Sequence, residues 1–165
     1  MKTPPSITNS LVAVPRAEIS VVDLDVPDAA AALSALAERA EAAGFVRPSF
    51  RSALLTRERQ HPTGLPTSIP VAIPHADTEH VLVPALGLAR LTHPVDFQEM
   101  GGGDSHVAVS FIVLILMTEP HEQVPLLSRL ITLFQQDDWY DGLAQATSAE
   151  ELVSVFSKLL ETATS

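Results

Sequence analysis

Apolar residues recur along the chain at two different spacings. Residues 19–24 form a short, largely β-branched segment that predicts a first strand. Over residues 33–40 the apolar side chains recur every three or four positions, which predicts a helix. Asp28 stands in front of this helix as a start signal, and Gly44 behind it is a natural stop. A second helix is expected at about residues 48–59.

The second half of the chain predicts strands separated by loops. Residues 60–70 hold three prolines and a glycine and predict an ordered loop. Strands are expected at residues 71–73 and 81–91, and a glycine-rich loop at residues 100–104. The most hydrophobic run, residues 107–117, is rich in β-branched residues and lacks polar alternation, which indicates a central strand buried on both faces.

Two C-terminal helices complete the pattern, at about residues 121–136 and 148–162. The second opens on a Ser-Ala-Glu-Glu sequence, which is typical of a capped helix start. Because strands and helices alternate and 165 residues suit one domain, we predict a single-domain α/β fold. We assign residues 10–165 to this domain and residues 1–9, which are rich in Pro, Ser and Thr, to a mobile tail.

Composition narrows the class of protein. Hydrophobic residues make up 46% of the chain and charged residues 18%, which is typical of a globular protein with a substantial core. Cysteine is absent, so disulfides, thiolate metal sites and a cysteine nucleophile are excluded. The formal net charge of −10 argues against nucleic acid and anionic membranes as partners. The N-terminus lacks the apolar core of a signal peptide, and the longest apolar run is too short to span a bilayer, so we expect a cytoplasmic protein.

A histidine placed just beyond a strand is the first candidate for chemistry. Pro74 cannot donate a hydrogen bond to a sheet, so the strand over residues 71–73 should end there and leave His75 on a stiff loop at the sheet edge. An imidazole in such a place can exchange protons, bind a metal or accept a phosphoryl group on a ring nitrogen. The structural alternative is a loop histidine that is bonded to a backbone carbonyl.

Other polar side chains carry weaker signals. His121 follows the central strand near a helix N-terminus, where it could equally be a solvent-facing residue of the first turn. Arg57 lies in the second predicted helix, where surface arginines usually pair with carboxylates. His75, Asp77 and His80 could in principle ligate a metal, but their spacing matches no strong zinc motif, and we expect no metal.

Together these residues resemble a known family, the type-2 IIA domain of the bacterial phosphoenolpyruvate-dependent sugar phosphotransferase system. This is the fructose/mannitol-type group, and the Pro-Thr-Gly-Leu stretch is most similar to its galactitol-type branch. The resemblance extends over about residues 16–162 and includes the second histidine, His121, after the central strand. The residues that carry it are Arg57-Glu58, His61-Pro62-Thr63-Gly64-Leu65 and Val71-Ala72-Ile73-Pro74-His75.

The resemblance implies a phosphoryl relay that needs no cofactor. In this family a histidine takes a phosphoryl group from the small phosphocarrier protein HPr and passes it to a cysteine of a IIB component. The membrane IIC permease then imports the sugar or polyol as it is phosphorylated. The resemblance makes His75 the phosphorylated histidine, Arg57 the active-site arginine and His121 the second active-site histidine. The family fold is a mixed β-sheet flanked by helices, which agrees with the pattern above.

The chemistry of these side chains suits the implied roles. A neutral imidazole is a nucleophile, a guanidinium offers a charged donor fork to phosphoryl oxygens, and a helix N-terminus favours an anion. Pro125 departs from the pattern: because it closely follows His121, the helix there should begin later or be kinked. Two alternatives stay open, namely a regulatory protein that controls a partner through the phosphorylation state of His75 and a binding module that is never phosphorylated.

Overall fold

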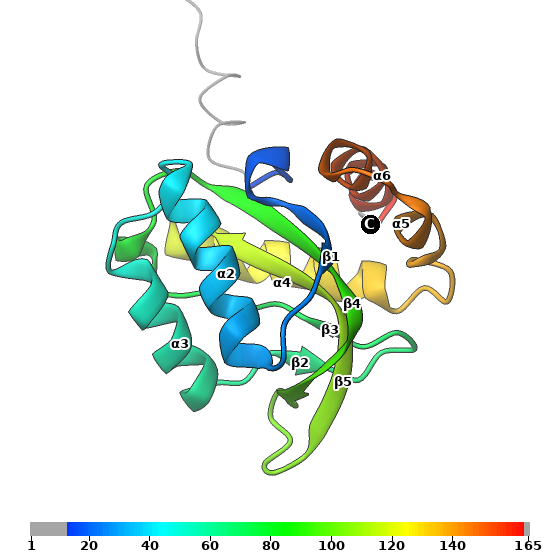
Figure 1. The fold of residues 1–165 in the computed structure, drawn as a ribbon, viewed down its shortest axis with the longest axis horizontal. Helices are drawn as coiled ribbons and strands as arrows, with labels where there is room; N and C mark the ends of the chain where they lie inside the picture. The colour runs from blue at the N-terminus through cyan, green and yellow to red at the C-terminus, as the bar shows by residue number, and fades with distance from the viewer. Residues whose placement is uncertain (1–12, 164–165) are drawn as a thin grey trace, which may run out of the picture.

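The computed structural model describes residues 13–163, which fold around one mixed five-stranded sheet (Figure 1). Its strands are β1 (Val21–Leu24), β2 (Gly64–Leu65), β3 (Val71–Ala72), β4 (Ala85–Gln98) and β5 (His106–Leu116). They lie in the order β1-β4-β5-β3-β2. β1 runs parallel to β4 and β3 parallel to β5, whereas the β4–β5 and β2–β3 pairs are antiparallel. The predicted α/β class and the mixed sheet implied by the resemblance are confirmed.

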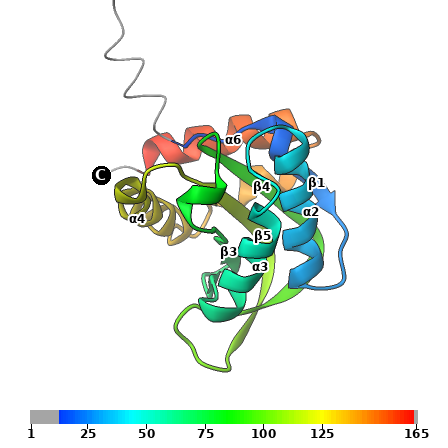
Figure 2. The ribbon, with the colours of Figure 1, turned by 90° about the vertical axis from the view of Figure 1, so that its left-hand side faces the viewer.

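Helices cover both faces of this sheet. They are α2 (Ala29–Ala42), α3 (Phe50–Gln60), α4 (Gln123–Phe134), α5 (Asp141–Gln145) and α6 (Ala149–Thr162). Helices α2 and α3 pack on one face, and α4, α5 and α6 pack on the other (Figure 1). In Figure 2 the side that carries α2 and α3 is turned toward the viewer. Short 3-10 helices occur at η1 (Ala17–Ile19), η2 (Thr78–His80) and η3 (Pro120–Glu122).

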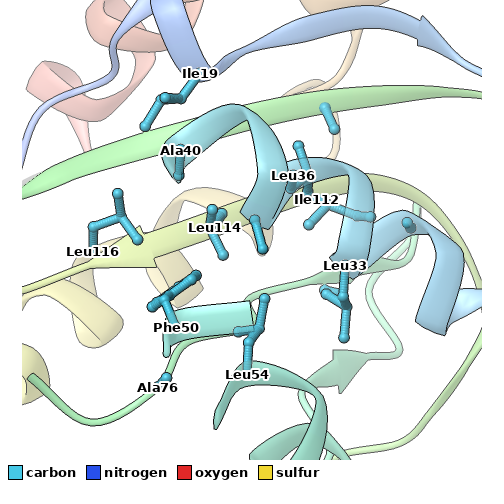
Figure 3. Close-up of a cluster of buried hydrophobic side chains, with 14 of the residues drawn as sticks. Ile19, Leu33, Leu36, Ala40, Phe50, Leu54, Ala76, Ile112, Leu114 and Leu116 are labelled. Carbon is cyan, nitrogen blue, oxygen red and sulfur yellow. The ribbon is translucent and has the colours of Figure 1, made fainter. Parts of the chain in front are cut away.

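Strand β5 separates two hydrophobic cores, because successive side chains of a strand point to opposite faces of the sheet. Ile112, Leu114 and Leu116 belong to the core under α2 and α3, which Figure 3 shows. The intervening residues of β5 belong to the core under α4, α5 and α6. Residues 111–116 are all buried, so the prediction of a central strand buried on both faces is confirmed for this half of β5.

Helix starts and stops follow the signals in the sequence. The Oδ1 atom of Asp28 accepts the backbone N–H of Ala31 at 2.8 Å and caps α2. The hydroxyl of Ser148 accepts the N–H of Glu151 at 3.1 Å and caps α6. Gly44 follows the end of α2 with a φ of +83°, a conformation that glycine adopts without strain. The helices predicted at these positions are therefore confirmed.

The core under α2 and α3 connects α3 with the segment that follows β3. Ala76, the residue after His75, is buried in this core, where Figure 3 shows it beside Phe50 of α3. Phe50 and Leu54 are fully buried there, and burial of each such side chain contributes about 1.5–3 kcal/mol. The packing therefore fixes α3 against the segment that follows β3.

The core under α4, α5 and α6 is rich in aromatic side chains. Trp139 is fully buried and meets Phe134 edge-on, with ring centroids 4.7 Å apart, and Phe111 at 5.7 Å. Phe111 also stacks on Phe156 of α6 at 6.0 Å. Trp139 is the single tryptophan of the chain, so its fluorescence reports on the folding of this core.

Some boundaries differ from those expected. Strand β2 lies within residues 60–70, which were expected to be a loop, because two residues there pair with β3. β4 begins later than residue 81 and continues to Gln98, and α5 was not predicted. The tail assigned to residues 1–9 lies outside the described residues. None of the helices within residues 13–163 combines the length and the apolar character that crossing a membrane requires.

Candidate active site

The segments that follow β3 and β5 leave the sheet at the same edge. β3 and β5 run parallel, with Val71 opposite Phe111, so their carboxyl ends lie at one edge of the sheet. His75 follows β3 there, and His121 follows β5. The topology therefore brings the two histidines singled out in the sequence to the same end of the sheet.

The segment that carries His75 is held from two sides. On one side Ile115 of β5 donates its N–H to the carbonyl of Pro74 at 3.0 Å, and Ile115 also forms a parallel bridge with His75. On the other side Ile73 donates its N–H to the carbonyl of Thr63 at 3.3 Å. β3 ends before Pro74, as its missing N–H predicts. His75 is fixed by these contacts and is only 7% exposed.

The ring of His75 has one defined tautomer. Its Nδ1 lies 3.0 Å from the carbonyl oxygen of Ile73, and because a carbonyl can only accept, Nδ1 carries the hydrogen. In the neutral ring the lone pair is then on Nε2. Burial lowers the pKa of His75, and the hydrogen bond to Ile73 opposes this effect only in part. The charge of Arg57 lowers the pKa further, and that of Asp77 acts to raise it. The carbonyl bond expected of a structural histidine is thus present, and it leaves Nε2 as a nucleophile near pH 7.

Arg57 lies in the last turn of α3 and approaches the same segment. Its Nη1 is 3.8 Å from Oδ1 of Asp77, two residues beyond His75. The Nε of Arg57 is buried and has no hydrogen-bond partner among the described residues. A guanidinium with an unpaired donor and a long ion pair can bind an anion such as a phosphoryl group. The adjoining hollow of about 440 Å³ is lined by Ala53, Thr56, Arg57, Gln60, His61 and Asp77.

His121 lies in η3 and is far more exposed than His75. Its side chain is 72% exposed, and its ring nitrogens are 3.9 Å from a carboxylate oxygen of Glu119 and 3.8 Å from one of Glu122. Across residues 13–163, no hydrogen bond or ion pair joins His121 to His75 or Arg57. The structure therefore connects Arg57 with the His75 segment and leaves His121 apart, beside an apolar hollow of about 300 Å³.

Pro125 fits the helix in which it lies. α4 begins at Gln123, so Pro125 falls in the first turn, where a missing N–H breaks no helical hydrogen bond. Of the two outcomes expected for this helix, the later start is confirmed. The 3-10 turn η3 then places His121 directly in front of the helix.

Comparison with known proteins decides the family. Residues 15–159 match the family model described as phosphoenolpyruvate-dependent sugar phosphotransferase system, EIIA 2. The chain belongs to this family. The galactitol-specific EIIA component of Escherichia coli K12 is 35% identical over 103 residues, which cover 62% of this chain and 68% of that protein. The fructose-specific EIIA component of Haloferax volcanii is 28% identical over 147 residues, which cover 87% of this chain and 93% of that protein.

A solved structure agrees with this assignment at the level of the fold. It is the complex of enzyme IIA(Mtl) with phosphorylated enzyme IIB(Mtl) from Escherichia coli, with a TM-score of 0.68, 23% identity, and coverage of 89% of this chain and 96% of that chain. As an EIIA component, the protein is a phosphotransferase that carries a phosphoryl group. The family and the galactitol-type similarity predicted from the sequence are confirmed.

Two residues near this EIIA site, Glu58 and Thr63, belong to the sequence motif but received no role from sequence reasoning. Thr63 donates its backbone N–H to Oε2 of Glu58 and its hydroxyl to Oε1, both at 2.9 Å. Burial raises the pKa of Glu58 to about 7, although the Thr63 bonds and the charge of Arg57 act to lower it. An acidic residue near a helix end with a threonine shortly after it was the available signal.

The side chains considered as metal ligands have other partners in this EIIA. Nδ1 of His80 lies 2.8 Å from the hydroxyl of Ser49, and its Nε2 lies 3.6 Å from a carboxylate oxygen of Glu79. Asp77 lies beside Arg57 instead. In the part of the chain that the structure describes, no group of three or more His, Asp or Glu side chains is arranged to hold a metal ion.

Proposed function

We propose that His75 is the residue of this EIIA component that carries the phosphoryl group. Nε2 of His75 attacks the phosphorus of phosphorylated HPr, and the bond from phosphorus to the donor atom of HPr breaks with its electron pair staying on HPr. In the second step a cysteine thiolate of a IIB component attacks the phosphorus. The phosphorus–nitrogen bond to His75 then breaks, and the lone pair returns to Nε2.

The observation that carries this proposal is the hydrogen bond from Nδ1 of His75 to the carbonyl of Ile73. It leaves the lone pair on Nε2, and the lowered pKa keeps that lone pair available near pH 7. Phosphoryl transfer depends on alignment and charge stabilisation more than on covalent help from neighbours. A ring that is fixed in position and in tautomer supplies the alignment.

Arg57 and His121 act in this proposal as residues that position the phosphoryl group. The unpaired, buried Nε of Arg57 and its charge suit the phosphoryl oxygens, and Asp77 orients the guanidinium. His121 precedes α4, where the helix dipole favours an anion. Because His121 makes fewer contacts with the rest of the site, we expect it to contribute less than Arg57 to positioning the phosphoryl group.

The partners follow from the relay. The Escherichia coli complex pairs a IIA with a phosphorylated IIB, which supports a IIB component as the acceptor for this chain. HPr is then the donor, and the final acceptor is a sugar or polyol, which is phosphorylated as a membrane IIC permease imports it. The IIC permease is therefore an indirect partner, and the EIIA component acts in the cytoplasm. Because one relative is galactitol-specific, a polyol of that class is the first substrate to test.

The proposal is tested by incubating the protein with phosphoenolpyruvate, enzyme I and HPr and following it by mass spectrometry. An acid-labile, base-stable phosphoryl group should appear on the peptide that contains His75 and be absent from His75→Ala. His121→Ala, the matched histidine variant, should still be labelled. Full labelling of folded His75→Ala would refute the assignment. Discharge by a galactitol-type IIB component supports transport, and a label that IIB cannot remove supports the regulatory alternative.

A further inference from the structure

A chain of hydrogen bonds connects Glu58 with the ring of His75. The carboxylate of Glu58 accepts the backbone N–H and the hydroxyl of Thr63, both at 2.9 Å. The carbonyl of Thr63 accepts the N–H of Ile73 at 3.3 Å. The carbonyl of Ile73 accepts the Nδ1–H of His75 at 3.0 Å. The last bond is the one that sets the tautomer of the ring.

The same series of hydrogen bonds connects the elements from which the proposed site is built. Arg57 and Glu58 lie in the last turn of α3, whereas His75 lies beyond β3. Thr63 immediately precedes β2, which pairs with β3. By binding Thr63 at two atoms, Glu58 connects the end of α3 to the pair of strands that leads to His75.

We propose that Glu58 is a positioning residue for phosphoryl transfer by His75. By holding Thr63, it places the carbonyl of Ile73 and thereby fixes the tautomer and orientation of the imidazole. This role in transfer rests on the proposed function of His75, whereas the effect on the tautomer of the ring can be measured without any phosphoryl donor.

Glu58 lies in surroundings that disfavour the charged form of its carboxylate, unlike a glutamate whose only role is to face solvent. Burial raises its pKa to about 7. The charged groups around it are Arg57 and Arg59 on its own helix and, across a hollow of about 260 Å³, Asp96 and His106 of the β4–β5 hairpin. Its two oxygens are nevertheless both bonded to one residue, and these bonds with Thr63 offset part of the cost of burial.

The chain contains a matched control for this contact. Thr147 donates its N–H and its hydroxyl to Oε1 of Glu151, at 2.7 and 2.8 Å, at the exposed start of α6. Removing Glu151 deletes an equivalent pair of bonds without touching the chain that reaches His75. A general loosening of the fold and a specific effect on the ring can therefore be told apart.

The first experiment reads the tautomer directly. Long-range proton–nitrogen NMR of the full, unphosphorylated protein distinguishes a protonated from an unprotonated ring nitrogen. Wild type and Glu151→Ala should show His75 with the hydrogen on Nδ1 alone, whereas Glu58→Ala should show a mixture of both tautomers. Glu58→Gln should behave like wild type, because its amide oxygen can accept the N–H of Thr63 while its amide group donates to the threonine hydroxyl.

The second experiment measures transfer from phosphorylated HPr at saturating concentration. Glu58→Ala should slow the step within the complex by about ten- to a hundredfold with little change in KM, since small displacements of a nucleophile have effects of this size. If Glu58→Ala does not fold, Thr63→Val removes the hydroxyl bond and keeps the N–H bond to Glu58, so a smaller effect in the same direction is expected, with Thr63→Ser as its rescue. In both pairs the conservative variant should recover most of the rate.

Three outcomes separate the possibilities. A single wild-type tautomer and a wild-type rate in folded Glu58→Ala would overturn the positioning role. An equal loss in Glu151→Ala would also overturn it, because the effect would then follow from any lost Thr–Glu contact. If wild-type His75 takes up no label, the proposed function fails, and the NMR result alone decides whether Glu58 fixes the ring.

Discussion

His75 and His121 leave the sheet at the same edge, but their surroundings are opposite. His75 is 7% exposed, its ring is bonded to Ile73, and its backbone is held by β5. The side chain of His121 is 72% exposed and lies on a single 3-10 turn between Glu119 and Glu122. One histidine is therefore fixed in position and tautomer, and the other is free to reorient in solvent.

Under the proposed function, this difference suits the two histidines to different tasks. A phosphoryl acceptor needs a defined lone pair and a low pKa, and His75 obtains both from burial and from one carbonyl. An exposed ring can change rotamer when a partner docks, at a cost of about 1 kcal/mol or less. We therefore expect changes around His75 to affect the chemical step strongly, and changes around His121 to affect it less and the encounter with partners more.

The largest effect is expected from Arg57, on the His75 side. Arg57→Ala should slow phosphoryl transfer by about tens- to a thousandfold, because a charge-assisted hydrogen bond in a dry site contributes roughly 2–4 kcal/mol to the transition state. Arg57→Lys should recover only part of the rate, since an ammonium lacks the planar donor fork. Rapid-quench kinetics at saturating phosphorylated HPr measure this. An unchanged rate in folded Arg57→Ala would place the guanidinium outside the reaction.

A smaller effect is expected from His121. His121→Ala should slow transfer by about tenfold, because a hydrogen bond from an exposed group contributes roughly 1–1.5 kcal/mol. His93, whose side chain is 53% exposed beside Asp25, is a matched surface histidine, and His93→Ala should transfer at the wild-type rate. The same quench experiment compares the three proteins. A loss in His121→Ala as large as that in Arg57→Ala would break the comparison and make His121 an equal part of the site.

The parts of the fold that could be predicted from the sequence are those with a local signal. β5 was visible as a continuous apolar run, and α2 and α6 were visible from their caps and spacing. β2 was not, because its two residues become a strand only by pairing with β3. α5 was also missed, since five residues with one buried side chain, Leu143, carry no periodic signal.

The same distinction applies to the site. His75 could be found from the sequence because Pro74 ends a strand in front of it, whereas the roles of Arg57 and His121 came from the family resemblance. The contact between Glu58 and Thr63 could not be predicted, because it depends on how the chain turns after α3. The burial of His75 has no signature in the sequence, whereas the exposure of His121 agrees with one of the two interpretations that its position in front of a helix left open.

Two buried titrating groups on the His75 side predict opposite dependences of stability on pH. The folded protein holds a proton on Glu58 up to about pH 7, whereas the unfolded chain loses it near pH 4.5, so this contribution to stability falls as pH rises through that window. The lowered pKa of His75 acts in the other direction. Below pH 6.5 the unfolded chain binds a proton that the folded ring refuses, so this contribution falls as pH decreases.

Glu58→Gln should remove the first contribution and leave the second. Relative to wild type, its free energy of unfolding should rise between pH 4.5 and 7 by at most about 1.4 kcal/mol per pH unit. Urea titrations followed by Trp139 fluorescence measure it. The pKa of Glu151 is lowered by its bonds to Thr147. The free energy of unfolding of Glu151→Gln should therefore rise relative to wild type only as pH decreases below 4.5. If the free energies of unfolding of Glu58→Gln and wild type differ by the same amount at every pH, burial does not raise the pKa of Glu58.

The smallest effect concerns the encounter with HPr and belongs to the His121 side. The chain has a net charge of −10, and Glu119 and Glu122 flank His121 at the edge where HPr approaches under the proposed function. A phosphocarrier with a basic patch is steered by such a surface, so the second-order rate constant for transfer should decrease as salt increases. The rate at saturation should change much less, because the groups around the buried His75 are screened less by salt.

Stopped-flow kinetics across a range of ionic strength can locate this steering. Glu119→Gln combined with Glu122→Gln should lower the second-order rate constant at low salt by about two- to fivefold and flatten its salt dependence. Glu38→Gln combined with Glu41→Gln removes the same charge from exposed positions of α2 and serves as the control. Equal effects of the two pairs would mean that net charge steers HPr and not the surface beside His121. A wild-type rate constant that stays flat with salt would mean that docking depends on apolar contact alone.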